Sequence, residues 1–243
     1  MAERFFQRVG AGLVACLLVA NAQGAELAQI RDGIDAAVIS GDNEALPGFA
    51  RELEGASGNW LPYYQAYLNY RGSQGADTSK KQAKKQLNRC IEILEEQLEK
   101  QPELVEAYGL LATCYGNSAN YYLLRAASRG SAANDALEEA LRLDSGNPRV
   151  LLQEAQSLIF RPAIFGGDKE KALERLQLAA EQFVTWRSDD AAAPVWGEAE
   201  TWLFIGILQR EAGETDAARV ALDKALEIAP GYSAAIAERA ELD

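Results

Sequence analysis

One eight-residue pattern occurs twice in the chain and constrains its fold more than any other feature. Residues 221–228 read Ala-Leu-Asp-Lys-Ala-Leu-Glu-Ile, and residues 136–143 read Ala-Leu-Glu-Glu-Ala-Leu-Arg-Leu. In both copies the apolar residues recur at helical spacing, and a proline follows within a few residues, Pro230 in one case and Pro148 in the other. Two copies of one amphipathic helix with the same terminator indicate an array of helical units.

The clearest unit spans residues 199–232. Gly206 and Ala218 are small where two antiparallel helices would approach each other, Gly213 is suited to end the first helix, and Pro230 stops the second. Together with Trp202, Ile205, Leu222 and Ala225, these residues resemble the tetratricopeptide repeat (TPR), with Gln209 in place of one expected aromatic residue. The resemblance is specific over the last third of the chain. It implies a right-handed superhelix that binds a partner in a concave groove.

The remaining chain repeats the helical pattern more loosely. Alanine, leucine and glutamate dominate, valine and isoleucine are sparse before residue 150, and hydrophobic residues make up 48% of the chain, which favours a helical core over a sheet. We therefore expect an all-α, right-handed superhelical solenoid of about five antiparallel helix pairs. The expected pairs are about 26–54, 59–100, 103–143, 147–183 and 195–229, followed by a capping helix at 233–242; residues 188–194 form a loop between repeats.

The first 24 residues have the order of a secretory signal peptide. Arg4 and Arg8 precede an apolar run over residues 9–20, and small residues then allow cleavage after Ala22 or Gly24. The domain would then cover residues 25–243 in the periplasm. An alternative takes Leu13 to Cys16 as a lipoprotein box, with a lipid anchor on Cys16, and only in that case do we expect membrane association.

The charge of the chain disfavours nucleic acid as a partner. The formal net charge is −12 at pH 7, and a surface of that sign repels phosphate backbones and anionic lipid headgroups. The exception is a basic cluster on a predicted helix, which we interpret at this stage as a solvated face. It consists of Lys80, Lys81, Lys84, Lys85 and Arg89.

The chain contains no histidine, which removes the commonest general base and most zinc sites. Its carboxylate pairs, such as Glu95 with Glu96, fall on helix surfaces without a neighbour that would raise one pKa. We expect no enzyme activity, no catalytic residues, no metal and no cofactor. Cys90 and Cys114 lie at matching distances from the turn at Gln101-Pro102, so we expect them to face each other as a disulfide or as two small apolar residues.

The loop Arg161-Pro-Ala-Ile-Phe-Gly-Gly-Asp168 is the most distinctive local segment. Pro162 ends a helix, Gly166 and Gly167 permit positive backbone angles, and Asp168 can cap the next helix. The loop is either a tight turn or a site where Arg161 and Phe165 contact a partner. Together with Asn147-Pro-Arg149, it is similar to exported TPR proteins such as the T component of tripartite (TRAP) transporters.

Two further groups of residues are candidates for partner binding. Trp60, Tyr64 and Tyr67 share one face of a predicted helix, while Tyr63 and Tyr70 share a neighbouring face; each set suits either the core or the groove. In the C-terminal unit, helical geometry and the TPR resemblance assign to the concave side Glu200, Leu203, Ile207, Arg210 and Glu211. These residues lack the lysines and asparagines with which some TPR proteins clamp a C-terminal carboxylate.

The sequence thus predicts a non-enzymatic periplasmic TPR scaffold that binds an unidentified protein or peptide partner in its concave groove. The alternative is a transport accessory, similar to the TRAP T component, that encloses a small, partly apolar ligand. An open groove would favour the first, and a closed pocket lined by the tyrosines and Phe165 would favour the second.

Overall fold

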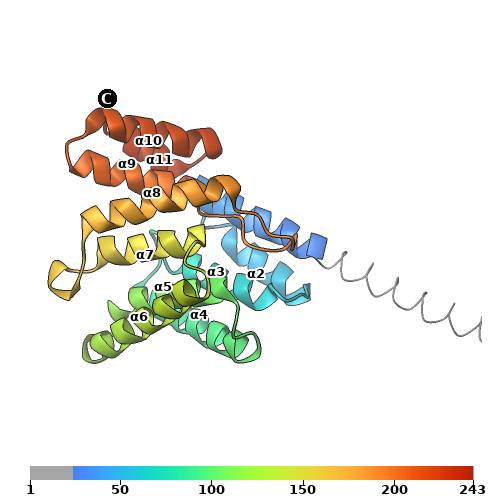
Figure 1. The fold of residues 1–243 in the computed structure, drawn as a ribbon. Helices are drawn as coiled ribbons and strands as arrows, with labels where there is room; N and C mark the ends of the chain where they lie inside the picture. Colours follow the sequence, from blue (N-terminus) through green and yellow to red (C-terminus); the bar gives the residue numbers. More distant parts are fainter. Residues whose placement is uncertain (1–23, 243) are drawn as a thin grey trace, which may run out of the picture.

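The computed structural model describes residues 24–242. Within that range the fold is all-α, with helices packed in pairs and no strand, and this confirms the predicted fold class (Figure 1). The expected signal peptide, its cleavage site and Cys16 lie outside the described residues. After a helical segment at residues 24–40, the helices are α2 (Leu46–Gly55), α3 (Leu61–Gly72), α4 (Lys80–Lys100), α5 (Val105–Ala119), η1 (Leu123–Arg125), α6 (Ala126–Leu143), α7 (Pro148–Phe160), η2 (Ala163–Phe165), α8 (Lys169–Thr185), α9 (Glu198–Glu211), α10 (Thr215–Ile228) and α11 (Ser233–Ala240).

The helix boundaries follow from local chemistry. The side chains of Ser79, Asn147 and Asp168 accept hydrogen bonds from backbone N–H groups in the first turns of α4, α7 and α8, so these three helix starts are capped. The cap expected at Asp168 is confirmed. Pro162 and Pro230 follow the ends of α7 and α10, as the sequence predicts.

The C-terminal pair α9–α10 has the close packing expected of its small residues. A Cβ at Gly206 would lie 2.6 Å from the Cγ of Leu222, so only glycine allows α9 this close to α10. Ala218 and Ala225 are fully buried at the same crossing. Gly213 ends the turn after α9 with φ +80°, which confirms the predicted helix end.

A disulfide joins the helices α4 and α5. It links Cys90 to Cys114, whose Cα atoms lie 6.3 Å apart. Both residues are fully buried in the main core, so the bond fixes the second pair of helices to the third from within. Of the two arrangements that the sequence left open for these cysteines, the structure has the disulfide.

The arc formed by the helix pairs is closed by long-range contacts. The helical segment 24–40 lies beside the connection between α8 and α9, where Arg31 Nη1 donates hydrogen bonds to the carbonyl oxygens of Ala191 and Ala193 at 2.7 and 2.8 Å (Figure 1). At the end of the same segment, Gly41 approaches Ser233 at the start of α11. The beginning and the end of the described chain are therefore in direct contact.

Candidate functional site

An irregular segment of the chain covers the aromatic residues of α3, and we call the side of the arc where they lie its inner face. Residues 186–197 leave α8, cross α3 and enter α9. Tyr64 donates a hydrogen bond to the carbonyl oxygen of Ala192 at 2.6 Å, and Trp196 Nε1 donates one to the hydroxyl of Tyr63 at 3.1 Å. The ring of Trp196 also stacks on Tyr67 with centroids 5.2 Å apart. We call residues 186–197 the covering segment.

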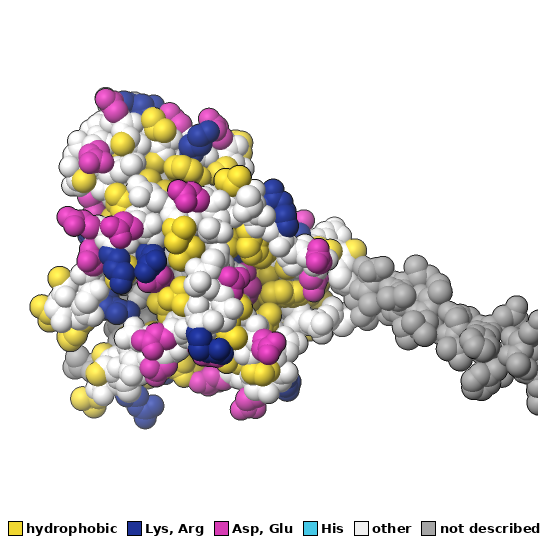
Figure 2. Space-filling view, in the orientation of Figure 1, with side chains coloured by type: hydrophobic (Ala, Val, Ile, Leu, Met, Phe, Trp, Pro, Cys, Tyr) yellow, Lys and Arg dark blue, Asp and Glu magenta, His cyan; other side chains and the backbone are white. Residues whose placement is uncertain are grey.

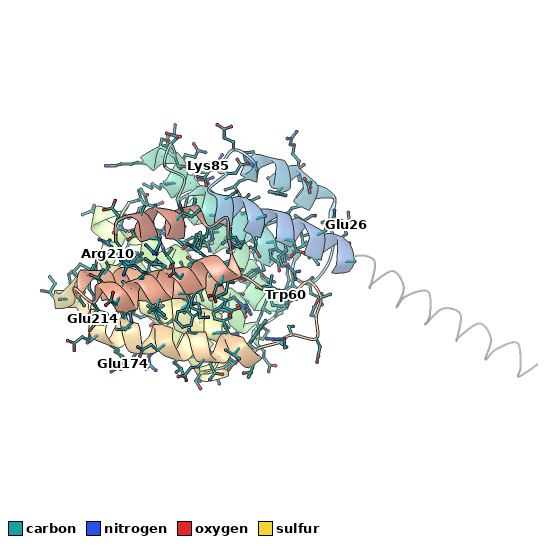
Figure 3. All side chains as sticks on the ribbon, turned by 90° about the horizontal axis from the view of Figure 1, so that it is seen from above. Glu26, Trp60, Lys85, Glu174, Arg210 and Glu214 are labelled. Atoms are coloured by element: carbon teal, nitrogen blue, oxygen red, sulfur yellow. A yellow bond between two sulfur atoms is a disulfide. The ribbon has the colours of Figure 1, made fainter. Side chains whose placement is uncertain are left out.

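The tyrosines of α3 are consequently part of the core. Tyr63, Tyr64, Tyr67 and Tyr70 are all less than 5% exposed, so both sets considered from the sequence are buried. Burial raises the pKa of Tyr63, Tyr64 and Tyr67 above the usual value for tyrosine, and the three groups remain neutral hydroxyls. Only Trp60 stays near the surface, where its Nε1 donates to Asp190 Oδ2 at 2.9 Å (Figure 3).

A buried ion pair holds the covering segment from the other side. Arg149 on α7 is fully buried, and its Nη2 lies 2.7 Å from Glu106 Oε1 on α5. Its Nη1 donates to the carbonyl oxygen of Trp196 at 3.3 Å, and its guanidinium carbon lies 3.9 Å from the ring centroid of Trp186. Asn147 also donates to Glu106 at 2.9 Å. Both ends of the covering segment are therefore tied to α7.

A second internal ion pair involves a predicted groove residue. Glu200 Oε2 on α9 lies 2.7 Å from Arg71 Nη2 on α3, and Gln156 on α7 donates to Glu200 Oε1 at 3.0 Å. Both charged side chains are about one-tenth exposed. The guanidinium of Arg71 also lies over the Trp196 ring, 5.3 Å from its centroid. Glu200 therefore joins three helices rather than facing an open groove.

One carboxylate lies in this interior without a hydrogen bond of normal geometry. Both carboxylate oxygens of Asp35 are buried and unpaired, although the residue as a whole is half-buried. Burial raises the pKa of Asp35 to about 7, against the opposing effects of Arg71, the nearby Tyr67 hydroxyl and Arg31. Asp35 therefore titrates near neutral pH inside the closed arc.

The other candidates from the C-terminal unit occupy different surroundings. Leu203 is buried and Ile207 is partly buried in a small core with Tyr232. Arg210 forms an ion pair with Glu238 of α11 at 2.9 Å, with about a third of its side chain exposed (Figure 3). The structure does not bring these residues together with the tyrosines of α3 into one open surface.

A cluster of exposed apolar side chains lies instead at the turn between α7 and α8. Phe160, Ile164 and Phe165 are 72%, 86% and 69% exposed, and Phe204 of α9 meets Phe160 edge to face with centroids 5.9 Å apart. We call these four residues the α7–α8 tip. Figure 2 shows hydrophobic side chains at the edge where Figure 1 places this turn.

The backbone of the α7–α8 turn is well fixed. Gly166 has φ +91°, as the sequence allows, whereas Gly167 is required because a Cβ there would collide with the carbonyl oxygen of Arg161. Arg161 Nη2 donates to Asn134 Oδ1 of α6 and to Ser157 Oγ, each at 2.6 Å. The structure therefore brings the predicted residues Arg161 and Phe165 into one turn, where Arg161 supports the backbone and Phe165 faces outward.

The described residues offer little that resembles a catalytic or metal centre. No group of three or more His, Cys, Asp or Glu residues in the described range could hold a metal ion. A shallow depression of about 150 Å³ between α3 and α4 is lined by Pro62, Gln65, Arg89, Ile93, Glu96, Gln97, Lys100 and Gln101. Among residues 24–242, no helix is long and apolar enough to cross a membrane.

Sequence reasoning missed the residues that fill the inner face. Asp35, Glu106, Arg149 and Trp196 carry no local signal, because their partners are distant in the chain. Arg149 stands out in the sequence only as part of the Asn147-Pro-Arg149 string. A cue exists in the covering segment, whose alanines, proline and tryptophans are unusual for a solvated loop.

Comparisons with known proteins support the fold. No protein-family model and no curated protein sequence matches the chain. Among solved structures, the chain is similar to the HusA haemophore from Porphyromonas gingivalis, with 22% identity, a TM-score of 0.63 and coverage of 76% of this chain and 92% of that one. It is also similar to TTC0263, a thermophilic TPR protein of Thermus thermophilus, with 16% identity, a TM-score of 0.51 and coverage of 82% and 98%. The chain has a TPR-like fold, as its C-terminal repeat predicts.

Proposed function

We propose that this chain is an exported, non-enzymatic binding protein that holds a protein or peptide partner at its α7–α8 tip. The supporting observation is the exposure of Phe160, Ile164 and Phe165 within six residues of one rigid turn. The groove expected for a TPR scaffold is an unsuitable site, because the covering segment buries its aromatic residues. We therefore assign partner binding to the edge of the arc rather than to its inner face.

The chemistry of the tip favours an apolar partner segment. Exposed large side chains cost free energy in water, and clusters of them commonly mark interaction surfaces. Aromatic residues on a fixed backbone lose little conformational entropy on binding, so Phe160 and Phe165 are suitable anchors. The four residues of the tip carry no charge, and we therefore expect the partner to contribute apolar side chains at the centre of the contact.

Two separate observations support the compartment that we propose. The N-terminal 24 residues have the order of a signal peptide, and Cys90 and Cys114 form a disulfide. Structural disulfides persist in oxidising compartments such as the bacterial periplasm. Both observations support export to the periplasm, with a lipid anchor on Cys16 as the alternative.

Site-specific photo-crosslinking tests the proposal. A photoreactive phenylalanine analogue at position 165 of the exported protein is expected to capture a discrete protein, which mass spectrometry identifies. The matched control carries the analogue at Val220, which is 62% exposed on α10 and is not part of the tip. Capture of the same protein from both positions, or undiminished capture after the substitution Ile164→Ser, would contradict a site at the tip.

A second candidate function is binding of a small, partly apolar ligand, as in a transport accessory. The similarity to a haemophore, over 92% of that chain, favours a porphyrin as the ligand to test. The chain has no histidine and its only methionine is Met1, so a haem iron would need another ligand such as a tyrosine. Haemin titration of residues 25–243, followed by Soret absorbance, is expected to give a saturable shift that Phe165→Ser weakens. A linear response without saturation argues against this candidate.

A further inference from the structure

A group of cations without carboxylate partners lies on the outside of the second and third helix pairs. It comprises Lys81, Lys84 and Lys85 on α4, Arg125 at the end of η1 and Arg129 in the first turn of α6, and we call it the basic corner. None of the five forms an ion pair with a described carboxylate, whereas the neighbouring Arg89 is paired with Glu92. In a chain of net charge −12, such a local excess of positive charge is unexpected. Figure 3 places Lys85 at the outer side of the ribbon, away from Glu174.

The corner is organised around the ring of Tyr122. Lys84 Nζ lies 3.9 Å and the guanidinium carbon of Arg129 lies 4.1 Å from the centroid of this ring. Asn88 donates to the Tyr122 hydroxyl at 2.5 Å and accepts from Arg129 Nη2 at 3.1 Å, while Arg129 Nη1 donates to Ser118 Oγ at 2.7 Å. The structure therefore holds two cations on one ring with neutral partners only, and their mutual repulsion is left uncompensated.

The position of the lysines on α4 increases the positive electrostatic potential of the basic corner. Residues 81, 84, 85 and 88 fall within one face of α4, because helical positions three and four apart are neighbours. The first turn of α4 contains no acidic residue. Lysines near a helix N-terminus oppose the helix dipole, so this arrangement lowers the stability of α4 while it concentrates positive charge. A helix face that only contacts water does not require this concentration of lysines at the helix N-terminus.

An apolar residue projects from the same corner. Leu124, in the short helix η1 beside Arg125, is 99% exposed. Because Leu124 is almost fully exposed, its side chain is free to enter the apolar boundary of a lipid layer. Cations around an inserted leucine, with tyrosine at the boundary, are the features with which proteins meet a lipid bilayer of negative surface charge.

We propose that the basic corner docks this protein on an anionic phospholipid surface, with Leu124 in the acyl boundary and the lysines on the headgroup phosphates. The strongly acidic remainder of the chain is repelled by the same surface. Binding is therefore weak, specific in orientation and sensitive to salt. The docking leaves the α7–α8 tip unused and does not depend on the function proposed for it.

Vesicle co-sedimentation tests the proposal with residues 25–243. The protein is expected to sediment with vesicles of mixed phosphatidylcholine and phosphatidylglycerol at low salt, and to be released by high salt. Vesicles of phosphatidylcholine alone are expected to retain little. The variant Lys81→Glu/Lys85→Glu is expected to bind about tenfold more weakly, and Leu124→Ser about threefold more weakly.

The matched control is Lys100→Glu/Lys171→Glu, which makes the same change in net charge at two exposed lysines without an ion pair in the described structure. Circular dichroism establishes that all variants are folded. The proposal is supported if the control binds like the unmodified protein. It is overturned if the control loses as much binding as the corner variant, if neutral vesicles bind equally well, or if only soluble polyglutamate binds, which would indicate an acidic protein segment as the partner.

Discussion

The C-terminal pair α9–α10 and the region around α3 use the same type of helix in opposite ways. In α9–α10 the core is made by small residues of adjacent helices, with Gly206 against Leu222 as the closest approach. Around α3 the core is made by large aromatic and charged side chains, several of which have partners more than a hundred residues away, as in the bond from Tyr64 to Ala192. Packing between adjacent helices keeps the α9–α10 repeat regular. Packing between segments that are distant in the sequence buries the face of α3 that was predicted to bind a partner.

This difference shows what happens to a repeat array that closes on itself. In an open array each repeat contacts only its neighbours, and the inner face stays available. Here the covering segment occupies that face, and the ion pair of Arg71 with Glu200 links α3 to α9. Three substitutions would test how far the two regions differ in stability.

The largest effect is expected for Arg149→Met, at the centre of the filled region. The change leaves Glu106 buried without its cation, and breaking a buried ion pair in this way costs about 3–5 kcal/mol. Urea denaturation measures the decrease in the free energy of unfolding. The double variant Arg149→Met/Glu106→Gln is the control and is expected to recover part of the loss. A decrease below about 1 kcal/mol for the single variant would mean that this pair does not hold the covering segment.

An intermediate, pH-dependent effect is expected for Asp35→Asn. Burial raises the pKa of Asp35 to about 7 in the folded protein, against about 3.9 in an unfolded chain. Between these values the folded state binds more protons than the unfolded state, so the free energy of unfolding falls as pH rises from about 4 to 7 and then levels off. Asparagine removes this penalty, and we expect a gain of up to about 4 kcal/mol above pH 7, the linkage value for a pKa difference of about 3, that vanishes near pH 4.

Thermal unfolding from acidic to neutral pH measures this difference. Asp32→Asn serves as the control, because Asp32 lies on the same helical segment but its side chain is 62% exposed beside Arg31. Equal pH dependence in the unmodified protein and in Asp35→Asn would show that Asp35 does not titrate in this range.

The smallest effect is expected for Arg210→Ala in the regular region. Arg210 and Glu238 form an ion pair that is about one-third exposed, and such pairs contribute about 0–1 kcal/mol. A double-mutant cycle with Glu238→Ala isolates the pair, and added salt is expected to reduce its contribution. A coupling free energy between Arg210 and Glu238 as large as that between Arg149 and Glu106 would contradict the expected difference in stability between the two regions.

The same distinction separates what the sequence could predict from what it could not. Helix pairs, the close approach at Gly206, the cap at Asp168 and the facing cysteines all follow from residues near one another or from a single turn. The burial of the α3 tyrosines does not, because hydrophobic spacing cannot say whether a partner chain or the protein itself covers a face. Arg149 and Glu106 lie 43 residues apart on two different helices, so no local pattern could pair them.

The closure of the arc also has a consequence for the order of folding. Arg31 donates to backbone carbonyl oxygens that are synthesised 160 and 162 residues later. The first helical segment therefore cannot complete its contacts until nearly the whole domain has been synthesised. Contacts of such long sequence separation slow folding. Until residues 186–197 are in place, the aromatic surface of α3 remains open to solvent and to other chains, which is the state most exposed to aggregation. The C-terminal part of the domain also contacts the first helical segment, where Gly41 meets Ser233, so removing it would take away contacts of that segment, which is not the case in an open solenoid.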